Sequence, residues 1–245
     1  MEIINEMSTQ KLINLIIRRR NELKITLTEL AIKSGLSALT ISEIESNKSI
    51  PSLDTLIKIL TILNVDLLLI DNDVIETSRL ILRKFKKDDA QEMYENWCND
   101  PEVTKFMTWN KHENIGVTQM ILDDWIKQYD NPGTIRYGIT LKDSGKLSGS
   151  IDVARYKDGN PEIGYCLARK YWNNGYTTEA CKEFIEYLFK IGFNKILIHA
   201  VVDNFASNRV IETCGFSFTH QEIKTPWSSF KPESVKLNCY EIKRN

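Results

Sequence analysis

The sequence predicts a small all-α unit followed by a larger α+β domain of mixed helices and strands. Over the first seventy residues, apolar side chains recur at helical spacing, for example in QKLINLIIRRRNEL and SLDTLIKILTIL. From Arg79 onward the pattern changes to alternating runs such as RLILRKF, EIGYCLA and KILIHAVV, separated by helical stretches. Polar and acidic residues interrupt both patterns in DNDVIETS, residues 71–78. We therefore expect two domains, residues 1–72 and residues 73–245.

The composition is that of an ordinary globular protein. Hydrophobic residues make up 42% of the chain, and no apolar run approaches the roughly 18 residues that a membrane span requires. The start, MEIINEMSTQKL, carries acidic residues where a secretory signal carries basic ones. We therefore expect a cytoplasmic protein with no cleaved leader and no membrane partner. The formal net charge of -1 argues against a general polyanion-binding protein and leaves room for a local basic face.

The cysteines and histidines are scattered along the chain. The five cysteines include no C-x-x-C pair, and the three histidines, His112, His199 and His220, lie far apart in the sequence. This pattern indicates reduced thiols, and neither a disulfide framework nor a zinc site. We therefore expect no bound metal.

The stretch LTELAIKSGLSALTISEIESNKSIPSLDTL has the pattern of two short helices joined by a turn. A short apolar stripe is followed by Gly35, where the turn requires a positive φ. Ser37, a favourable N-cap residue, then begins a second helix that is expected to bury Ile41 and Ile44. This order is typical of a helix-turn-helix unit.

The order of helix, glycine turn, S-x-x-x-I-S-x-I-E, N-K and P-S-L-x-T-L resembles the Cro/CI (Xre) class of phage and bacterial repressors over roughly residues 8–64. The resemblance implies that the second helix lies in the major groove of DNA. The base-facing set contains no Arg, Gln or Asn, the types that make most bidentate base contacts, so a module kept for dimerisation or protein contact is the alternative. The implied contacts are Ala38, Leu39, Thr40 and Glu43 toward the bases, and Ser37, Asn47 and Lys48 near phosphates.

Two further features of this unit allow two interpretations each. The run NVDLLLID carries more apolar side chains than one small module can cover, so residues 66–70 either pair with a second copy in a homodimer or pack against the following domain. The arginines Arg18, Arg19 and Arg20 either face phosphates or form a solvated helix end that complements the helix dipole.

The stretch YWNNGYTTEA joins a predicted strand to a predicted helix. The preceding EIGYCLA alternates, and the following TEACKEFIEYLFKIG places Ala180, Phe184, Leu188 and Ile191 on one helical face. The asparagines and Gly175 leave the backbone free to bend, so that successive N–H groups and the helix dipole can point at one anion. The junction therefore indicates a phosphate-binding site.

Three ordered blocks carry a second resemblance: ETSRLILRKFKKDDAQEMYENWCNDPEVTKFMTW, EIGYCLARKYWNNGYTTEA and VVDNFASNRVIETCGF. Over about residues 76–245 they are similar to the GCN5-related N-acetyltransferases (GNAT), in particular to the branch that contains the ribosomal-protein N-terminal acetyltransferases. The resemblance implies an α+β fold with a central, splayed, mostly antiparallel sheet. It also implies acetyl-CoA as cosubstrate and a primary amine as acceptor, at a protein N-terminus or on a small molecule.

The resemblance also implies which residues bind the coenzyme, in a cleft where two central strands splay apart. One strand pairs with the pantetheine arm, the following loop and helix start receive the pyrophosphate, and the asparagine after a later strand reaches the pantetheine amides. The family pattern Q/R-x-x-G-x-G/A is altered here at Trp172 and Thr177, which leaves the main-chain donors in place. The implied residues are Ile163, Tyr165, Leu167, Trp172, Asn173, Asn174, Gly175, Tyr176, Thr177, Thr178, Asn204, Ser207 and Asn208, with a plain N-cap role as the alternative for Ser207 and Asn208.

Acetyl transfer to an amine requires a neutral amine, a polarised thioester carbonyl and a proton for the departing thiolate. The resemblance implies Glu162 as the general base, because it opens the strand that lines the acetyl site and corresponds to a carboxylate often found there in this branch; the alternative is an edge surface carboxylate. A backbone amide within residues 163–168 is expected to polarise the carbonyl. Ser207 is the candidate proton donor to the thiolate. Many members of the family that the sequence resembles use a tyrosine for this role, and none is near NRVIETCGF in the sequence, so the acid role stays open.

Four residues are candidates for the acceptor side of the cleft. Trp109, His112 and Glu113, in MTWNKHENIG, are expected to shape the amine pocket or simply to pack there. Asp152, in SGSIDVARY, either faces the same cleft and attracts a cationic amine or faces solvent.

The sequence thus predicts an acetyl-CoA-dependent N-acetyltransferase with a DNA-binding domain. The alternative is a transcriptional regulator whose second domain senses acetyl-CoA without turnover, and a third interpretation is a former enzyme that serves as a protein-binding platform.

Overall fold

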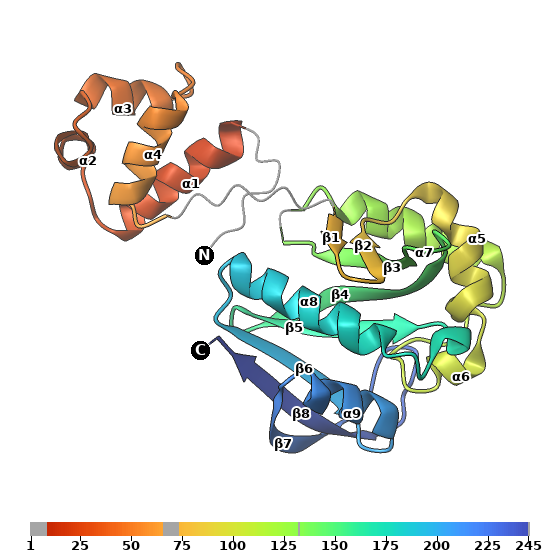
Figure 1. Cartoon of the computed structure of the whole chain (residues 1–245). Coiled ribbons are helices and arrows are strands. Elements are labelled where there is room, and N and C mark those ends of the chain that lie inside the picture. The colour runs from red at the N-terminus through yellow and green to blue at the C-terminus, as the bar shows by residue number, and fades with distance from the viewer. Residues whose placement is uncertain (1–8, 66–73, 132, 245) are drawn as a thin grey trace. The chain divides into compact units, whose positions relative to one another are not determined.

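The computed structural model describes residues 9–65, 74–131 and 133–244 (Figure 1). The chain divides into two compact units, Met1–Ile70 and Asp71–Asn245. The expected domain boundary at residues 72 and 73 and the expected pairing segment at residues 66–70 lie outside the described residues, so both stay predictions. None of the described helices combines the length and the apolar character that crossing a bilayer requires.

The first unit consists of helices, as its periodicity predicts. They enclose a core of buried aliphatic side chains that includes the predicted Ile41 and Ile44. The helices are α1 (Thr9–Glu22), α2 (Leu27–Ser34), α3 (Ala38–Glu45) and α4 (Leu53–Ile62).

The turn between α2 and α3 has the predicted geometry. Gly35 adopts φ 68°, in the left-handed region, and ends α2. The Ser37 hydroxyl accepts a hydrogen bond from the Thr40 amide at 3.0 Å and thereby caps α3. Both local interpretations of the sequence are therefore confirmed.

An ion pair joins α1 to α3. Arg20 donates from Nε and Nη2 to the two carboxylate oxygens of Glu45, at 2.6 and 2.8 Å, and both side chains are largely buried. Arg20 is therefore a structural residue of the helix packing, whereas Arg19 pairs with Glu22 at the exposed end of α1. Of the three arginines considered as phosphate contacts, Arg20 is therefore already bound to Glu45 within the unit.

The described residues of the second unit form one eight-stranded sheet. The strand order is β1-β2-β3-β4-β5-β6-β8-β7, and the β5–β6 pair is parallel while the others are antiparallel. This confirms the expected mostly antiparallel sheet. The strands are β1 (Val74–Glu76), β2 (Leu80–Arg83), β3 (Arg136–Leu141), β4 (Leu147–Lys157), β5 (Asn160–Leu167), β6 (Lys195–Val201), β7 (Ser217–Lys224) and β8 (Val235–Lys243).

Helices cover both faces of this sheet (Figure 1). On one face, α8 (Tyr176–Lys190) buries its predicted apolar stripe and α9 (Phe205–Thr213) lies beside it. On the other face, a second core forms around the fully buried Trp97. Its elements are the turn Lys87–Asp89, α5 (Ala90–Met93), the π-helical turn Tyr94–Cys98, α6 (Pro101–Thr104) and α7 (Ile115–Gln128).

The β5–β6 pair is where the sheet opens. Its ladder consists of one residue pair, Glu162 opposite Leu197, whereas the ladder between β4 and β5 has eight. Because both strands run in the same direction, the opening lies beyond this pair, toward their carboxyl ends. The implied splay is thus present at the centre of the sheet.

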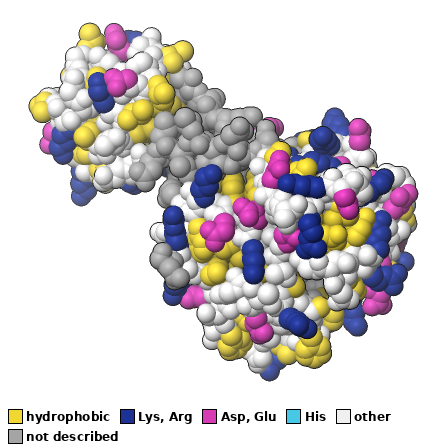
Figure 2. Space-filling view, in the orientation of Figure 1, with side chains coloured by type: hydrophobic (Ala, Val, Ile, Leu, Met, Phe, Trp, Pro, Cys, Tyr) yellow, Lys and Arg dark blue, Asp and Glu magenta, His cyan; other side chains and the backbone are white. Residues whose placement is uncertain are grey.

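The surface carries no charge of one dominant sign on the face that Figure 2 shows, where acidic and basic side chains are interspersed over the second unit. This distribution agrees with the net charge of -1. On this face, therefore, no single-sign patch favours a charged partner.

Candidate active site

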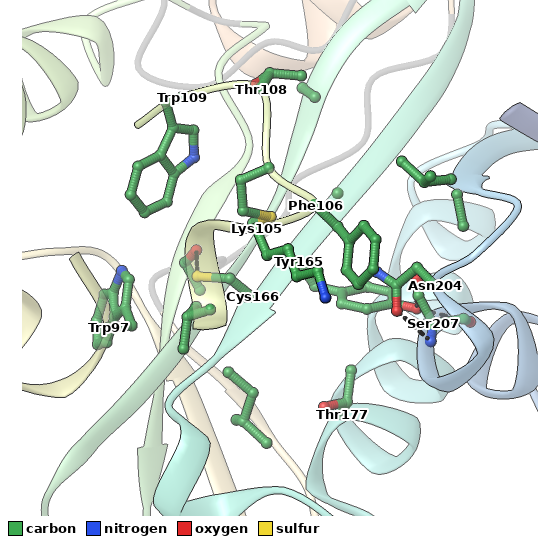
Figure 3. Close-up of a pocket in the computed structure, with 18 of the residues that line it drawn as sticks. Trp97, Lys105, Phe106, Thr108, Trp109, Tyr165, Cys166, Thr177, Asn204 and Ser207 are labelled. Atoms are coloured by element: carbon green, nitrogen blue, oxygen red, sulfur yellow. Dashed lines mark hydrogen bonds between the residues drawn. The ribbon is translucent and has the colours of Figure 1, made fainter. Parts of the chain in front are cut away.

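A cavity of about 1410 Å³ opens between β5 and β6 and continues beneath the segment that contains Trp97. All five tryptophans of the chain contribute to its lining. Figure 3 shows its two sides: Trp97 and Trp109 lie on one side, Asn204 and Ser207 lie on the other, and Tyr165 lies between them. The cavity is large enough for a coenzyme arm and an acceptor together.

The loop before α8 forms a nest of main-chain donors at one end of the cavity. Asn173 and Gly175 both adopt left-handed backbone angles, with φ 61° and 75°. Gly175 occupies the N-cap position without a side chain to cap the helix, so the first amides of α8 have no intramolecular cap. Such a helix start can bind an anion through its amides and dipole.

Two side chains of this loop hold its shape. Asn174 donates to the carbonyls of Tyr171 and Trp172, and Trp172 Nε1 donates to the Leu167 carbonyl at 2.7 Å. The Asn174 amino group and the Trp172 indole N–H are therefore used within the loop and against β5, and the group of Asn174 that is expected to bind the pyrophosphate is its backbone amide.

The start of α8 is fastened to the β1–β2 turn by Glu179. Its carboxylate accepts hydrogen bonds from Thr77 Oγ1, Ser78 Oγ and the Arg79 amide, at 2.6 to 2.9 Å, and it pairs with Arg79 Nε at 2.7 Å. Burial favours the neutral acid, but these hydrogen bonds outweigh it and lower the pKa of Glu179 to about 2. Arg79 also donates to the Asn174 carbonyl at 3.0 Å. Sequence reasoning missed this support because its partners are about 100 residues apart.

The three polar residues after β6 have different roles in the fold. Asn204 caps α9, since its Oδ1 accepts a hydrogen bond from the Ser207 amide at 3.2 Å. Asn208 is buried; its Nδ2 donates to the Val201 and Asn204 carbonyls. Its Oδ1 accepts from Asn238 and Tyr240. The Asn208 carboxamide thus has no hydrogen-bonding capacity left for a ligand, which differs from its expected coenzyme contact.

A tyrosine lies beside Ser207. The Tyr165 hydroxyl, which β5 carries across the opening, is 2.9 Å from Ser207 Oγ (Figure 3). Burial raises the pKa of Tyr165 well above its usual value, so the phenol keeps its proton at neutral pH. No tyrosine is near this helix in the sequence, since Tyr165 is 42 residues away from Ser207 along the chain.

Glu162 lies on the opposite face of β5 and is 6% exposed. Its carboxylate accepts from Arg155 Nε and Nη2, at 2.8 and 2.9 Å, and lies 3.1 Å from His199 Nδ1. Burial opposes ionisation, yet His199 and Arg155 lower the pKa of Glu162 to about 2. Glu162 is therefore a buried, ion-paired carboxylate. This differs from the alternative in which it is a surface carboxylate at the edge of the sheet.

A β-bulge in β4 makes this cluster possible. The register of β4 against β5 shifts between Val153 and Arg155, so that Arg155 lies opposite Glu162. Without the extra residue, the arginine would point to the other face of the sheet. Nothing in the local sequence indicates such a bulge.

Asp152 is a second ion-paired carboxylate of the cavity wall. Arg136 Nε donates to Asp152 Oδ2 at 3.0 Å, and the guanidinium lies 4.4 Å from the Trp125 ring centroid. Burial raises the pKa of Asp152, and Arg136 acts in the opposite direction. Asp152 therefore faces the cavity, which is the first of the two orientations, cleft or solvent, that the sequence left open.

The loop with Trp109, His112 and Glu113 lines the acceptor side. His112 is buried, its Nδ1 lies 2.8 Å from Thr118 Oγ1, and burial lowers its pKa. Its ring packs on Trp109, with centroids 5.3 Å apart, whereas Glu113 is exposed. His112 is thus a support for the tryptophan.

A second loop, residues 225–231, closes over the first one. Lys231 Nζ donates to the Thr104 carbonyl at 2.9 Å, and Asn110 Nδ2 donates to the Phe230 carbonyl at 3.2 Å. The sequence gives no local signal for this contact between segments 120 residues apart. The acceptor-side residues that sequence reasoning missed are Trp97, Trp125, Arg136, Arg155, His199, Trp227 and Phe230.

In the first unit, the expected DNA contacts lie around the exposed side of α3. Leu39 is 67% exposed, and Thr40 and Glu43 are half-buried. The Ser37 and Thr40 hydroxyls, 2.8 Å apart, are already engaged in the cap. The other exposed members are Ser37, Ala38, Asn47 and Lys48.

One metal-type group occurs among the described residues. The ligand atoms of His220, Glu222 and Cys239 lie within 4.8 Å of one another on β7 and β8. His220 is exposed, and Glu222 and Cys239 are half-buried. The expected absence of a metal stays a prediction.

The fold and cavity define a class: a transferase fold with a splayed sheet and an anion-binding helix start, preceded by a helix-turn-helix unit. A sequence model described as acetyltransferase (GNAT) domain matches residues 79–217, and one described as helix-turn-helix matches residues 16–70. The chain belongs to the GNAT acetyltransferase family. The expected family, fold class and enzyme class are thereby confirmed.

Individual relatives agree with this membership. The uncharacterized N-acetyltransferase YoaA of Bacillus subtilis (strain 168) is 32% identical over 146 residues, which cover 58% of this chain and 82% of YoaA. Microcin C7 self-immunity acetyltransferase MccE, solved with acetyl-CoA and AMP, is 21% identical with TM-score 0.60, covering 69% of this chain and 94% of MccE. RimL, a ribosomal L7/L12 alpha-N-protein acetyltransferase solved with coenzyme A, is 15% identical with TM-score 0.61. The match covers 69% of this chain and 97% of RimL. At these identities, the two solved structures support the fold.

Proposed function

We propose that this GNAT-family protein transfers the acetyl group of acetyl-CoA to a primary amine. The observation that carries the proposal is the pairing of two features in one cavity: an uncapped helix start at one end and buried, ion-paired carboxylates at the other. The first suits a pyrophosphate and the second suits a cationic amine. Between them lies the open edge of β5, whose backbone has a partner on β6 at one position only.

The coenzyme is proposed to lie along β5 and across the start of α8. Backbone groups near Ile163, Tyr165 and Leu167 pair with the pantetheine arm, and the amides of residues 173–178 receive the pyrophosphate. Asn204 borders the arm at the end of β6. The coenzymes named for the solved MccE and RimL complexes support this choice of ligand.

Acetyl transfer then requires few groups of the protein. The amine nitrogen attacks the thioester carbonyl carbon, the C–S bond breaks, and the sulfur leaves as a thiolate that takes a proton. A main-chain amide within residues 163–168 stabilises the carbonyl oxygen. The Tyr165 and Ser207 hydroxyls, held together at 2.9 Å, donate a hydrogen bond to the departing sulfur.

The acceptor is proposed to be a primary amine that reaches the tryptophan-lined side of the cavity. Trp109 and Glu113 border its entrance, and Asp152 supplies a negative charge inside. A protein N-terminus and a small-molecule amine both fit this description. RimL acts on a protein N-terminus, according to its name, and thus supports the first choice.

The helix-turn-helix unit is proposed to bind DNA through α3. The support is the exposed position of its predicted contacts and the match to a helix-turn-helix family. DNA as a partner and five unpaired cysteines both fit the cytoplasm, where thiols stay reduced.

The test of the enzyme measures release of free CoA thiol from acetyl-CoA against a panel of amines and amino-terminal peptides, with calorimetric binding of acetyl-CoA alongside. We expect turnover on at least one acceptor, and we expect the double variant Glu162→Ala, Asn204→Ala to lose most of it. Binding of acetyl-CoA without turnover on any acceptor would favour the coenzyme-sensing regulator.

The matched control is Glu186→Ala, Asn194→Ala, which removes the same side-chain types from exposed positions outside the cavity. It should behave as wild type. A Glu162, Asn204 double variant as fast as this control would refute the proposed site.

A further inference from the structure

Gly164 makes a gap in the acceptor-side wall of β5. Asp152 lies opposite Gly164 on β4, and a Cβ atom at Gly164 would lie 3.5 Å from Asp152 Oδ1. Directly opposite residues project to the same face of a sheet. One carboxylate oxygen therefore borders the space that a side chain at residue 164 would fill.

His199 lies on the other side of the opening, on β6, and projects to the same face of the sheet as Gly164. Gly164 follows Glu162 by two residues on β5, and His199 follows Leu197 by two residues on β6. Because Glu162 is opposite Leu197 and side chains alternate along strands, Gly164 and His199 come next on the acceptor side. The 3.1 Å contact between Glu162 and His199 Nδ1 agrees with this arrangement.

Glu162 is poorly suited to take a proton itself. Both of its oxygens already accept hydrogen bonds from Arg155, and the low pKa described above makes its carboxylate a weak base. An ionised carboxylate can only accept, so the Nδ1 atom of His199 carries the hydrogen in their contact. In the neutral ring, Nε2 is then the basic nitrogen.

We propose that His199, oriented by Glu162, is the proton acceptor for the amine, and that the amine lies over Gly164 between His199 and Asp152. This inference rests on the proposed acetyl transfer and replaces the carboxylate base that the sequence suggests. Asp152 attracts the ammonium form, and His199 Nε2 removes one proton from it. The neutral amine forms the N–C bond as the C–S bond breaks, and the second proton leaves the nitrogen as the thiolate is protonated.

The proposal also defines the acceptor class. The amine must be an unhindered primary amine, since the gap at Gly164 is the space of one missing side chain beside Asp152 and Ala154. It must also arrive as a cation, because the bordering oxygen belongs to a carboxylate. An α-amino group fits both conditions, with a reference pKa of ~7.7 to 8.0 that a modest base can overcome near neutral pH.

The neighbours of His199 matter for the pH dependence. On β8, Cys239 lies opposite His199, and burial raises the pKa of its thiol, which therefore stays neutral near pH 7. The charged and titratable groups on the nearby strands include Asp152, Arg155 and Lys157 on β4, Glu162 on β5, Lys236, Glu241 and Lys243 on β8, and His220, Glu222 and Lys224 on β7.

The test compares His199→Gln with His220→Gln, a matched control on the exposed side of β7 that does not line the cavity. With an acceptor found by the thiol-release assay, we expect His199→Gln to lower kcat/KM about 100-fold at pH 7, within the range of general base catalysis. Acetyl-CoA affinity and thermal stability should stay near those of the control. The deficit should shrink above about pH 9, where the α-amine loses its own proton.

Two further variants keep the inference falsifiable. His199→Ala should regain activity with added imidazole, which a purely structural residue would not do. Gly164→Ala has ordinary contact distances to its neighbours and should fold, but it should raise the acceptor KM at least 10-fold while acetyl-CoA still binds. A wild-type protein that turns over no acceptor would overturn the proposed function and this inference with it. Turnover by the wild type with His199→Gln within threefold of the His220→Gln control would overturn this inference alone.

Discussion

The two faces of strand β5 differ in which polar groups remain available to bind a ligand. On the coenzyme side, Asn174, Asn208 and Glu179 bond to other parts of the protein, and what remains for a ligand is mainly backbone N–H and C=O groups. On the acceptor side, Glu162 and Asp152 are held by arginines inside the cavity, and the groups proposed to meet a ligand are the side chains of Asp152 and of His199, which Glu162 orients. Main-chain binding tolerates sequence change, whereas recognition by buried charges depends on the identity of each residue.

The largest effect should come from the acceptor side. Asp152→Asn keeps the shape and the bond to Arg136 but removes the negative charge, so we expect acceptor kcat/KM to fall up to 100-fold, as loss of a charged hydrogen bond worth ~1.5 to 3 kcal/mol implies. Steady-state kinetics and calorimetry measure the two ligands separately. Asp143→Asn, at an exposed position, is the control. An equal loss of acetyl-CoA affinity would break the distinction between the two faces.

The coenzyme side should respond to backbone geometry. Valine strongly disfavours the left-handed φ of 75° at residue 175, so Gly175→Val should weaken acetyl-CoA binding about 10-fold with little effect on the acceptor KM. Gly145→Val imposes the same strain at φ 68° in the turn between β3 and β4 and should leave affinity unchanged. If both valine variants bind acetyl-CoA like wild type, main-chain geometry is not what holds the coenzyme.

A smaller effect is expected on the pH dependence of stability, through Glu179. The pKa of Glu179 is lowered from 4.5 to about 2 in the folded protein, so its stabilisation is complete above pH 4.5 and is lost as the pH falls toward 2. Glu179→Gln should therefore be less stable than wild type near pH 6, and the difference should narrow below pH 4.5. Denaturant unfolding at several pH values measures this, with Glu186→Gln on the exposed face of α8 as reference. A constant difference across this range would contradict the assigned ionisation.

Ser207→Ala should have the smallest effect of these variants, a modest decrease in kcat. The Tyr165 hydroxyl remains to donate to the departing sulfur, so we expect kcat to fall about threefold, close to the value of one neutral hydrogen bond. Tyr165→Phe, measured in the same thiol-release assay, should have the larger effect. The reverse order would make Ser207 the principal donor, as the sequence alone suggests.

Sequence reasoning succeeded where the determinants are local. Helical periodicity, the positive φ at Gly35, the Ser37 cap and the apolar stripe of α8 all depend on residues within a few positions of one another. The same is true of the loop around Gly175, whose left-handed angle follows from glycine itself.

The acceptor side could not be predicted in the same way. Glu162 and His199 meet because two strands from separate blocks run in parallel, and Arg155 joins them only because of a bulge in β4. Tyr165 reaches Ser207 across the opening of the sheet for a similar reason. Such contacts depend on strand order and register, which a single sequence does not specify.

Hydrogen bonds to Glu179 hold the start of α8 against the turn between β1 and β2. Thr77, Ser78 and Arg79 are among the first residues after the connection to the helix-turn-helix unit, and they hold the first turn of α8. The order of the first turn of α8, and with it the proposed pyrophosphate site, therefore depends on one carboxylate that residues about 100 positions earlier in the chain hold in place.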